Sequence, residues 1–290
     1  MIERVATGAD YLELITALLQ RARLAADEAG LWEAGDLQWW WRRDQHADPA
    51  NARFWIDDEG VPIAAVIVTD FTDSWGFDVI AVPDQGELTR SVLWPNALER
   101  IAQLPTRPTE IAVRDDDLFT GTLLRESGFA VVDPSAMTCW MAAADHPDVP
   151  SIATGYRLVS TADRGAHPHH MVARNGAHVA ERLRECSLYR PELDLCIEAP
   201  SGEVAAYGLF WADPVTRVGL VEPMRTEDQH QNKGLGRHLL CAGLARLAQH
   251  GCTRLKVTYL EGNEPAGRLY VGVGFTPRTR SETYRRTLDP

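Results

Sequence analysis

Lysine is almost absent from this chain of 290 residues: it occurs only at Lys233 and Lys256, and arginine supplies the other positive charges. Acidic residues outnumber Lys and Arg by 41 to 29, for a formal net charge of −12. That charge does not attract nucleic acid or an anionic membrane, so we expect neither as a partner. It favours cationic molecules instead.

Long apolar runs and paired cysteines are also missing. No run approaches the roughly 20 apolar residues of a membrane helix, and the first residues lack the basic-then-apolar pattern of a secretion signal. A cytoplasmic location is therefore expected. The cysteines are odd in number and form no C-x-x-C pair, so we expect free buried thiols and no disulfide framework or zinc knuckle. They are Cys139, Cys186, Cys196, Cys241 and Cys252.

The order of predicted elements repeats along the chain. A segment over 143–154 has the Pro and polar residues of a linker, which divides the chain into domains at 1–145 and 146–290. An offset of 146 superposes the halves and places Asp117 on Asn263 and Gly128 on Gly274. The mixture of strands and helices predicts an α/β (α+β) fold of two tandem domains. Each should be a mixed, largely antiparallel twisted sheet flanked by helices.

The stretch HQNKGLGR begins at His230 and leads into a predicted helix over 235–250. A helix start presents unpaired N–H groups and a positive dipole end to an anion. Gly234 and Gly236 lack Cβ, which allows a ligand to approach the backbone closely. The pattern suits a pyrophosphate, although a purely structural role for the glycines stays open at this point. A dinucleotide loop fits less well because the third glycine is missing.

A second pattern follows at 263–275, NEPAGRLYVGVGF. Together with Q-x-x-G-x-G one strand earlier, the spacing N-x-x-A-x-x-L-Y-x-x-x-G-F resembles the GCN5-related N-acetyltransferase (GNAT) superfamily over 154–290. The likeness is to a tandem bacterial type with a degenerate N-terminal copy. It implies acetyl-CoA as cosubstrate, no metal, and transfer to a small-molecule amine.

The resemblance also implies site residues. Tyr270 matches the general acid that protonates the departing CoA thiolate. Glu222, expected on the central strand, is the candidate general base, with a structural role equally open. The implied acetyl-CoA-binding residues are Met224, Arg225, Thr226, Gln231, Asn232, Lys233, Gly234, Leu235, Gly236, Arg237, Asn263 and Ala266.

The first repeat has lost the equivalent residues. The two glycines fall on Leu88 and Arg90 and the tyrosine falls on Leu124, so the N-terminal copy is not expected to catalyse acyl transfer. It is expected to serve as a scaffold. Within it, QWWWRR at 38–43 places three tryptophans about 100° apart on a helix. They cannot all face one core, so at least one must meet an interface, a pocket or solvent.

Histidines gather in a predicted helical region over 166–186, at His167, His169, His170 and His178. No carboxylate or cysteine is suitably spaced beside them, so no metal site is expected. In the family plan this region borders the acceptor pocket. His170, Arg174 and His178 either line that pocket or belong to a solvated face.

The sequence therefore predicts an N-acetyltransferase that moves an acetyl group from acetyl-CoA to a primary amine of a small molecule by direct attack. Peptide N-terminal acetylation and mycothiol-type synthesis are narrower alternatives. An acyl-CoA-binding sensor or regulatory protein without turnover is an alternative of another class. The sequence does not identify the acceptor or decide between a monomer and a homodimer.

Overall fold

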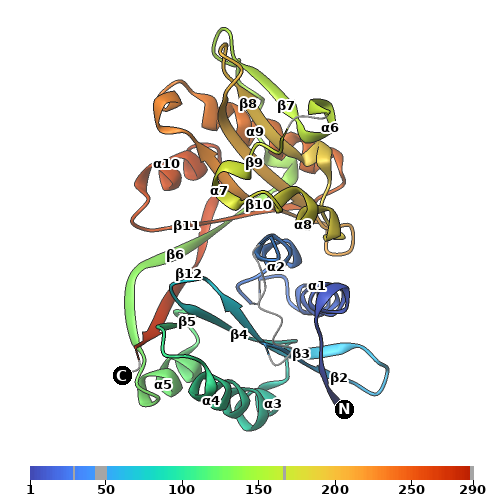
Figure 1. Cartoon of the computed structure of the whole chain (residues 1–290), viewed down its shortest axis with the longest axis vertical. Helices are drawn as coiled ribbons and strands as arrows, with labels where there is room; N and C mark the ends of the chain where they lie inside the picture. Colours follow the sequence, from blue (N-terminus) through green and yellow to red (C-terminus); the bar gives the residue numbers. More distant parts are fainter. Residues whose placement is uncertain (29, 43–50, 166–167, 288–290) are drawn as a thin grey trace. The chain divides into compact units, whose positions relative to one another are not determined.

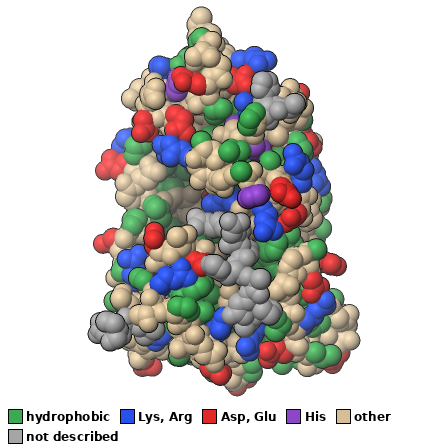
Figure 2. Space-filling model, in the orientation of Figure 1, with side chains coloured by type: hydrophobic (Ala, Val, Ile, Leu, Met, Phe, Trp, Pro, Cys, Tyr) green, Lys and Arg blue, Asp and Glu red, His purple; other side chains and the backbone are tan. Residues whose placement is uncertain are grey.

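The computed structural model describes residues 1–28, 30–42, 51–165 and 168–287. In this part of the chain no helix is both long enough and apolar enough to cross a bilayer. Acidic and basic side chains are interspersed over the face drawn in Figure 2. Contacts divide the chain into two compact units. Unit 1 comprises Met1–Trp40, Asp44–Ala136 and Thr279–Pro290, and unit 2 comprises Trp41–Arg43 and Met137–Arg278.

Unit 1 is a twisted sheet with the strand order β1-β2-β3-β4-β5-β12. Its pairings are antiparallel except that of β4 with β5. Helices α1 and α2 lie on one face of the sheet and α3, α4 and α5 on the other (Figure 1). The elements are β1 (Ile2–Val5), α1 (Gly8–Ala25), α2 (Ala34–Trp40), β2 (Ala52–Ile56), β3 (Pro62–Asp70), β4 (Trp75–Ala81), α3 (Gly86–Leu88), the π-helical turn η2 (Thr89–Leu93), α4 (Trp94–Gln103), β5 (Thr109–Arg114), α5 (Leu118–Glu126), the first part of β6 (Ala130–Ala142) and the second part of β12 (Thr276–Arg286).

Unit 2 is built in the same way, with the strand order β6-β11-β10-β9-β8-β7. Only β10 and β11 pair in parallel among the pairings from β7 to β11. Its elements are the second part of β6, η3 (Ala143–Asp145), β7 (Arg157–Ser160), α6 (Thr161–Arg164), α7 (Val172–Asn175), α8 (Val179–Glu185), η4 (Pro191–Leu193), β8 (Asp194–Glu198), β9 (Val204–Ala212), β10 (Val218–Thr226), η5 (Asp228–His230), α9 (Leu235–Gln249), β11 (Arg254–Leu260), α10 (Glu264–Gly272) and the first part of β12.

The duplication is visible in matching helix starts. Asp117 caps α5 by accepting a hydrogen bond from the Thr120 N–H at 3.0 Å. Asn263, 146 residues later, caps α10 through the Ala266 N–H at 3.2 Å. A side-chain oxygen at this position satisfies an N–H that the helix itself leaves unpaired. The predicted fold class, two tandem α/β sheets flanked by helices, is confirmed.

Two helical predictions hold in part. Apolar spacing over 8–46 predicts helix, but α1 ends at Ala25 and α2 starts only at Ala34. The region expected to be mostly helical over 166–186 contains two short helices, α7 and α8, among its described residues. Glycines in left-handed conformations separate the pieces, at Gly30 (φ 74°) and Gly176 (φ 84°). The cysteine prediction is confirmed: all five are free and buried.

Parallel pairing stops early in both sheets. In unit 2 the last parallel pair is Val221 with Val257, although β10 continues to Thr226. A register shift against β9 follows between Val221 and Met224, around Pro223, which has no N–H to donate. In unit 1 the last parallel pair is Phe77 with Ile111. We call the openings beyond these pairs the unit 1 gap and the unit 2 gap.

Helix α9 packs closely on β9 because Gly243 has no side chain. A Cβ at this position would lie 2.0 Å from the Phe210 ring, which is itself fully buried. The contact holds the helix that begins at the glycine-rich loop against the sheet.

A buried histidine–carboxylate cluster ties the segment before α7 to the start of β8. His169 Nε2 lies 2.7 Å from Asp194 Oδ2, and His170 Nε2 lies 2.9 Å from Asp194 Oδ1. The Tyr189 hydroxyl donates to Asp194 Oδ2 at 2.9 Å. Burial alone would raise the pKa of Asp194, but hydrogen bonds and charge from the two histidines outweigh it and lower that pKa. His169 and His170 are both buried. The expectation that His170 lies on a solvated face is therefore wrong.

Gly243→Ala should destabilise the protein by about 1–3 kcal/mol, because the new methyl group overpacks against Phe210. Gly272→Ala is the matched control, since a Cβ there meets only Arg237 Nη1 at 3.7 Å. Urea unfolding measures both free energies. Equal stability of the two variants would contradict the close α9–β9 packing.

Asp194→Asn should destabilise the protein by about 3 kcal/mol near pH 7, because it removes the charge that both imidazoles face. The folded carboxyl has a lowered pKa, so its contribution is present above the unfolded pKa of about 3.9 and is lost as the pH falls further. The difference from wild type should therefore narrow below about pH 4. Exposed Glu181→Gln on α8 is the control. The midpoints of denaturant unfolding are measured across pH. If Asp194→Asn and Glu181→Gln have the same midpoints at every pH, the stabilising role of the Asp194 charge is ruled out.

Candidate active site

The unit 2 gap exposes two backbone amides of β10. The Glu227 N–H donates to Ala205 O on β9 at 2.9 Å, and successive amides of a strand point to opposite edges. The N–H groups of Met224 and Thr226 therefore point away from β9, toward the opening where β11 no longer pairs. A strand edge of this kind can hydrogen-bond an extended amide-containing chain.

The loop before α9 has the left-handed backbone conformation that glycine allows. Asn232 and Gly234 both have positive φ, 60° and 75°, so the loop approaches the left-handed arrangement in which successive N–H groups converge on an anion. A Cβ on Gly236 would lie 3.2 Å from Thr226 Oγ1 and 3.6 Å from Leu269 Cδ2. The missing side chain therefore keeps the helix start open beside β10, as a pyrophosphate would require.

Tyr270 and Glu222 lie close enough to interact electrostatically. Tyr270 on α10 is buried, with its ring 6.0 Å from that of Tyr259 and 6.3 Å from that of Phe275. Burial, followed by the charges of Glu222 and Cys139, raises the pKa of the Tyr270 phenol. The phenol is therefore kept protonated. The Glu222 carbonyl accepts a hydrogen bond from Trp211 Nε1 at 2.7 Å, which fixes the backbone at the register shift.

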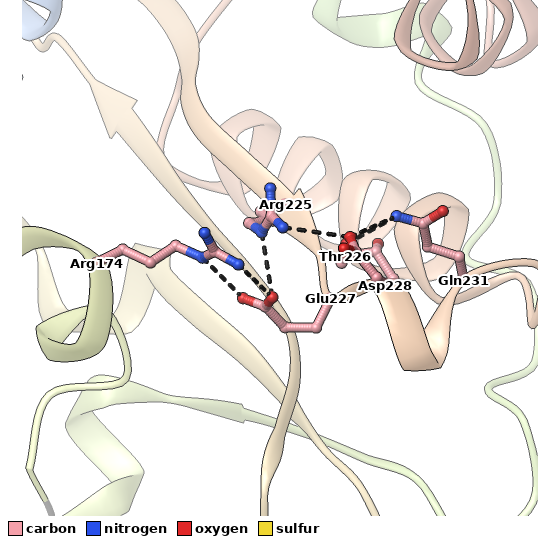
Figure 3. Close-up of polar contacts among 6 residues, drawn as sticks. All are labelled: Arg174, Arg225, Thr226, Glu227, Asp228 and Gln231. Atoms are coloured by element: carbon pink, nitrogen blue, oxygen red, sulfur yellow. Dashed lines mark hydrogen bonds and ion pairs between the residues drawn. The ribbon is translucent and has the colours of Figure 1, made fainter.

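Figure 3 shows a polar network at the end of β10. Glu227 accepts from Arg174 Nη2 at 2.7 Å and from Arg225 Nε at 3.2 Å. Arg225 also reaches Asp228 at 3.3 Å, and Gln231 Nε2 donates to the same carboxylate at 3.2 Å. The hydrogen bond from Arg174 is the main reason that the pKa of Glu227 is lowered. Arg225, expected beside the pyrophosphate, is thus paired with two acids.

Lys233 belongs to a chain of hydrogen bonds behind the loop. Its Nζ donates to the Tyr156 hydroxyl at 2.9 Å and to Gln229 O at 3.3 Å. Tyr156 in turn lies 3.0 Å from His230 Nδ1, and His230 Nε2 lies 2.9 Å from Glu203. The ammonium group is exposed but held at a defined position beside the loop.

The other predicted residues border the same region. Arg237 Nη1 donates to Gly272 O at 3.0 Å, which joins α9 to α10. Leu235 is buried in the core below the loop. The Asn263 side-chain oxygen accepts from the Ala266 N–H as a helix cap, so only its amide N–H groups are available to a ligand.

The histidine cluster also tests the expectation of no metal. The reason given for it is wrong, because folding brings Asp194 to both His169 and His170, within 4.8 Å of one another. The Met171 N–H donates to His169 Nδ1 at 3.2 Å, however. That bond places the imidazole proton on Nε2, where it faces Asp194. For His169 the arrangement is that of a structural hydrogen bond rather than of a metal ligand.

Two further predictions concern aromatic and histidine runs. Trp39 and Trp40 belong to unit 1, whereas Trp41 belongs to unit 2, where its Nε1 donates to Glu185 at 2.6 Å. The three tryptophans thus do not share one core. His170 is buried in the cluster, while Arg174 and His178 are exposed at α7 and α8. His167 and Arg43 lie outside the described residues.

The first repeat does not form the glycine loop. Helix α3 already begins at Gly86, and Leu88, in the place of Gly234, has a right-handed conformation (φ −57°). Leu124, in the place of Tyr270, is fully buried. No phenol stands there.

Sequence reasoning missed Glu227, Asp194 and the Tyr156–His230 pair. Each acts through a partner distant in the sequence, 53 residues in the case of Arg174 and Glu227. The only local signal was a pair of acids, Glu227 and Asp228, placed directly between a strand and the loop.

Comparison with known proteins finds a family match over most of the second repeat. Residues 156–275 match the acetyltransferase (GNAT) family. Over 99 residues the chain is 34% identical to a spermine/spermidine N(1)-acetyltransferase of Bacillus subtilis, covering 33% of this chain and 64% of that protein. Over 69 residues it is 38% identical to a mycothiol acetyltransferase of Thermobispora bispora, covering 24% of this chain and 23% of that protein. The chain therefore spans less than two thirds of either relative.

Solved structures resemble the whole chain at low identity. A tandem GNAT protein from the clavulanic acid biosynthesis pathway has a TM-score of 0.70 at 18% identity, covering 100% of this chain and 99% of that one. A GCN5-related N-acetyltransferase from Sphaerobacter thermophilus has a TM-score of 0.66 at 16% identity, covering 100% of this chain and 96% of that one. These likenesses show the fold. Residues 156–275 thus contain a domain that matches the GNAT acetyltransferase family, in a chain that has the fold of a tandem GNAT protein.

Proposed function

We propose that unit 2 transfers an acetyl group from acetyl-CoA to a primary amine of a small molecule. The observation that carries the proposal is the unit 2 gap, where parallel pairing ends at Val221 and Val257. The gap lies between the glycine-rich loop and Tyr270. It offers strand amides for the pantetheine arm and converging loop amides for the pyrophosphate. Asn263 borders it from α10.

The residues of the gap suit direct attack. The acceptor ammonium must first lose a proton, and the Glu222 carboxylate receives it directly or through a water. The neutral amine then attacks the thioester carbonyl, and the Met224 N–H stabilises the oxygen that becomes negative. When the C–S bond breaks, Tyr270 gives its proton to the thiolate, and the surplus proton on the former amine nitrogen passes to the Tyr270 phenolate, which leaves the amide, free CoA thiol and protonated Glu222. The proton transfers thus use groups that already interact in the fold.

The acceptor is proposed to be a small amine for two reasons. The B. subtilis relative is named for polyamines, and the acidic net charge favours cations. A sensor that binds acyl-CoA without turnover would need the loop but not a buried phenol next to a carboxylate. Tyr270 therefore supports the enzyme. Release of free CoA thiol in the presence of an amine panel distinguishes the two.

Tyr270→Phe should slow transfer by about tenfold or more, because the thiolate then leaves without an acid. The affinity for acetyl-CoA should change little, since the ring remains. Thiol release measures the rate and isothermal titration measures the affinity. Tyr259→Phe, whose ring lies beside Tyr270, is the control and should keep its rate. An unchanged rate in Tyr270→Phe would exclude the acid role.

Gly236→Val should abolish binding of acetyl-CoA, because its branched side chain fills the space between α9, Thr226 and Leu269. Titration of the wild type should give one site per chain, since unit 1 lacks the loop. Gly86→Val at the equivalent helix start of unit 1 is the matched control and should leave that site intact. Two sites in the wild type, or binding by Gly236→Val, would place the donor elsewhere.

A further inference from the structure

Unit 1 has an opening between β4 and β5, the unit 1 gap, although it has no glycine loop. Beyond the last pair, Phe77 with Ile111, β4 and β5 diverge and line a cavity of about 180 Å³. Residues of both strands line it, together with Trp32 and Trp94. A cavity kept between diverging strands and walled by indole rings is a common form of small-molecule site.

A buried carboxylate faces this cavity. Asp78, the first residue of β4 after the last parallel pair, is 7% exposed. Its Oδ1 accepts a hydrogen bond from Trp32 Nε1 at 2.7 Å, and the Trp32 ring packs edge-on against Trp40 at 4.8 Å. Burial and, to a smaller extent, the charge of Asp36 raise the pKa of Asp78 to about 7, against the effect of the Trp32 hydrogen bond.

The cations around the cavity are engaged with other groups. Arg23 pairs with Glu33 at 2.5 Å, with both side chains buried. Arg114 pairs with Asp116 at 2.7 Å. Among the described residues no Lys or Arg forms an ion pair with Asp78, so the fold itself supplies no positive charge to this carboxylate.

The cavity is not suited to a pyrophosphate. Leu88 and Arg90 lie within a helix where unit 2 has its glycines, and the buried acid would repel an anion. The indole nitrogen of Trp94 is buried and has no acceptor in the described part of the protein. A ligand that carries an oxygen acceptor could satisfy it.

From this geometry we propose that the unit 1 gap binds a small organic cation, an ammonium group on a compact apolar body, through Asp78 and the indoles of Trp32 and Trp94. The ammonium neutralises Asp78, which forms no ion pair among the described residues, whereas the other lining carboxylate, Asp117, caps α5. The indole faces attract a cation and cover its apolar part. Leu124 stands where unit 2 has Tyr270, so binding of the amine is proposed here without any reaction. The argument depends on unit 1 alone and not on the activity proposed for unit 2.

The test uses the full chain without acetyl-CoA. Phenethylamine is titrated as the cation, phenethyl alcohol as its neutral analogue and hydrocinnamate as the anion, by isothermal titration calorimetry. The indole N–H signals of Trp32 and Trp94, assigned with single Trp→Phe variants, report binding in unit 1 by NMR. Asp78→Asn keeps the acceptor for Trp32 but removes the charge. Glu222→Gln controls for amine bound in unit 2.

Phenethylamine should shift both indole signals in the wild type and in Glu222→Gln, and Asp78→Asn should weaken its binding by about tenfold or more. The alcohol should bind at least about tenfold more weakly than the amine, and the anion should not bind. The affinities for the amine and the alcohol are compared in the wild-type protein. This test of the proposal therefore remains valid even if Asp78→Asn fails to fold. Unmoved indole signals at saturating amine, or equal affinity for amine and alcohol, would overturn the proposal.

Discussion

Backbone hydrogen bonding is the constraint on which the site depends. Almost every buried N–H and C=O group in a folded protein must find a partner, yet β10 and β11 stop pairing at Val221 and Val257. The register shift after Val221 and the missing N–H of Pro223 let the strands diverge there. The amides of Met224 and Thr226 are then presented to a partner from outside the sheet. A ligand with its own amides can complete the ladder that the protein leaves open.

The charges around the loop refine how an anion would be held. Positive side chains are fewer there than the sequence suggests, because Arg225 is shared between Glu227 and Asp228. On the proposed function, an anion would be held mainly by the loop amides and by Lys233, which Tyr156 positions. Glu227 also fixes Arg174 of α7 to the end of β10. One carboxylate thus connects the strand that borders the gap with the segment expected beside the acceptor.

Local patterns predicted much of this molecule. The sequence also predicts a strand at RLKVTYL and a helix over 264–272, and both are confirmed, because capping residues and apolar spacing act over a few residues. The positive φ of Gly234 at the start of α9 agrees with the glycine loop expected from the sequence, whereas the roles of the loop and of Tyr270 stay predictions from the family resemblance. The contacts of Asp194 were not predicted, since they depend on how distant segments meet. Nor did helical periodicity over 8–46 reveal the left-handed Gly30 that lies between α1 and α2.

The strands β6 and β12 have a consequence for the history of the two repeats. Residues 137–142 of the first repeat lie beside β11 in unit 2, where Thr138 Oγ1 meets Thr258 Oγ1 at 3.0 Å. Residues 281–286 of the second repeat pair with β5 in unit 1. Neither half of the gene, cut at the linker, would therefore encode a complete sheet. The exchange makes the copies mutually dependent, so the first can lose its loop and its tyrosine without becoming dispensable.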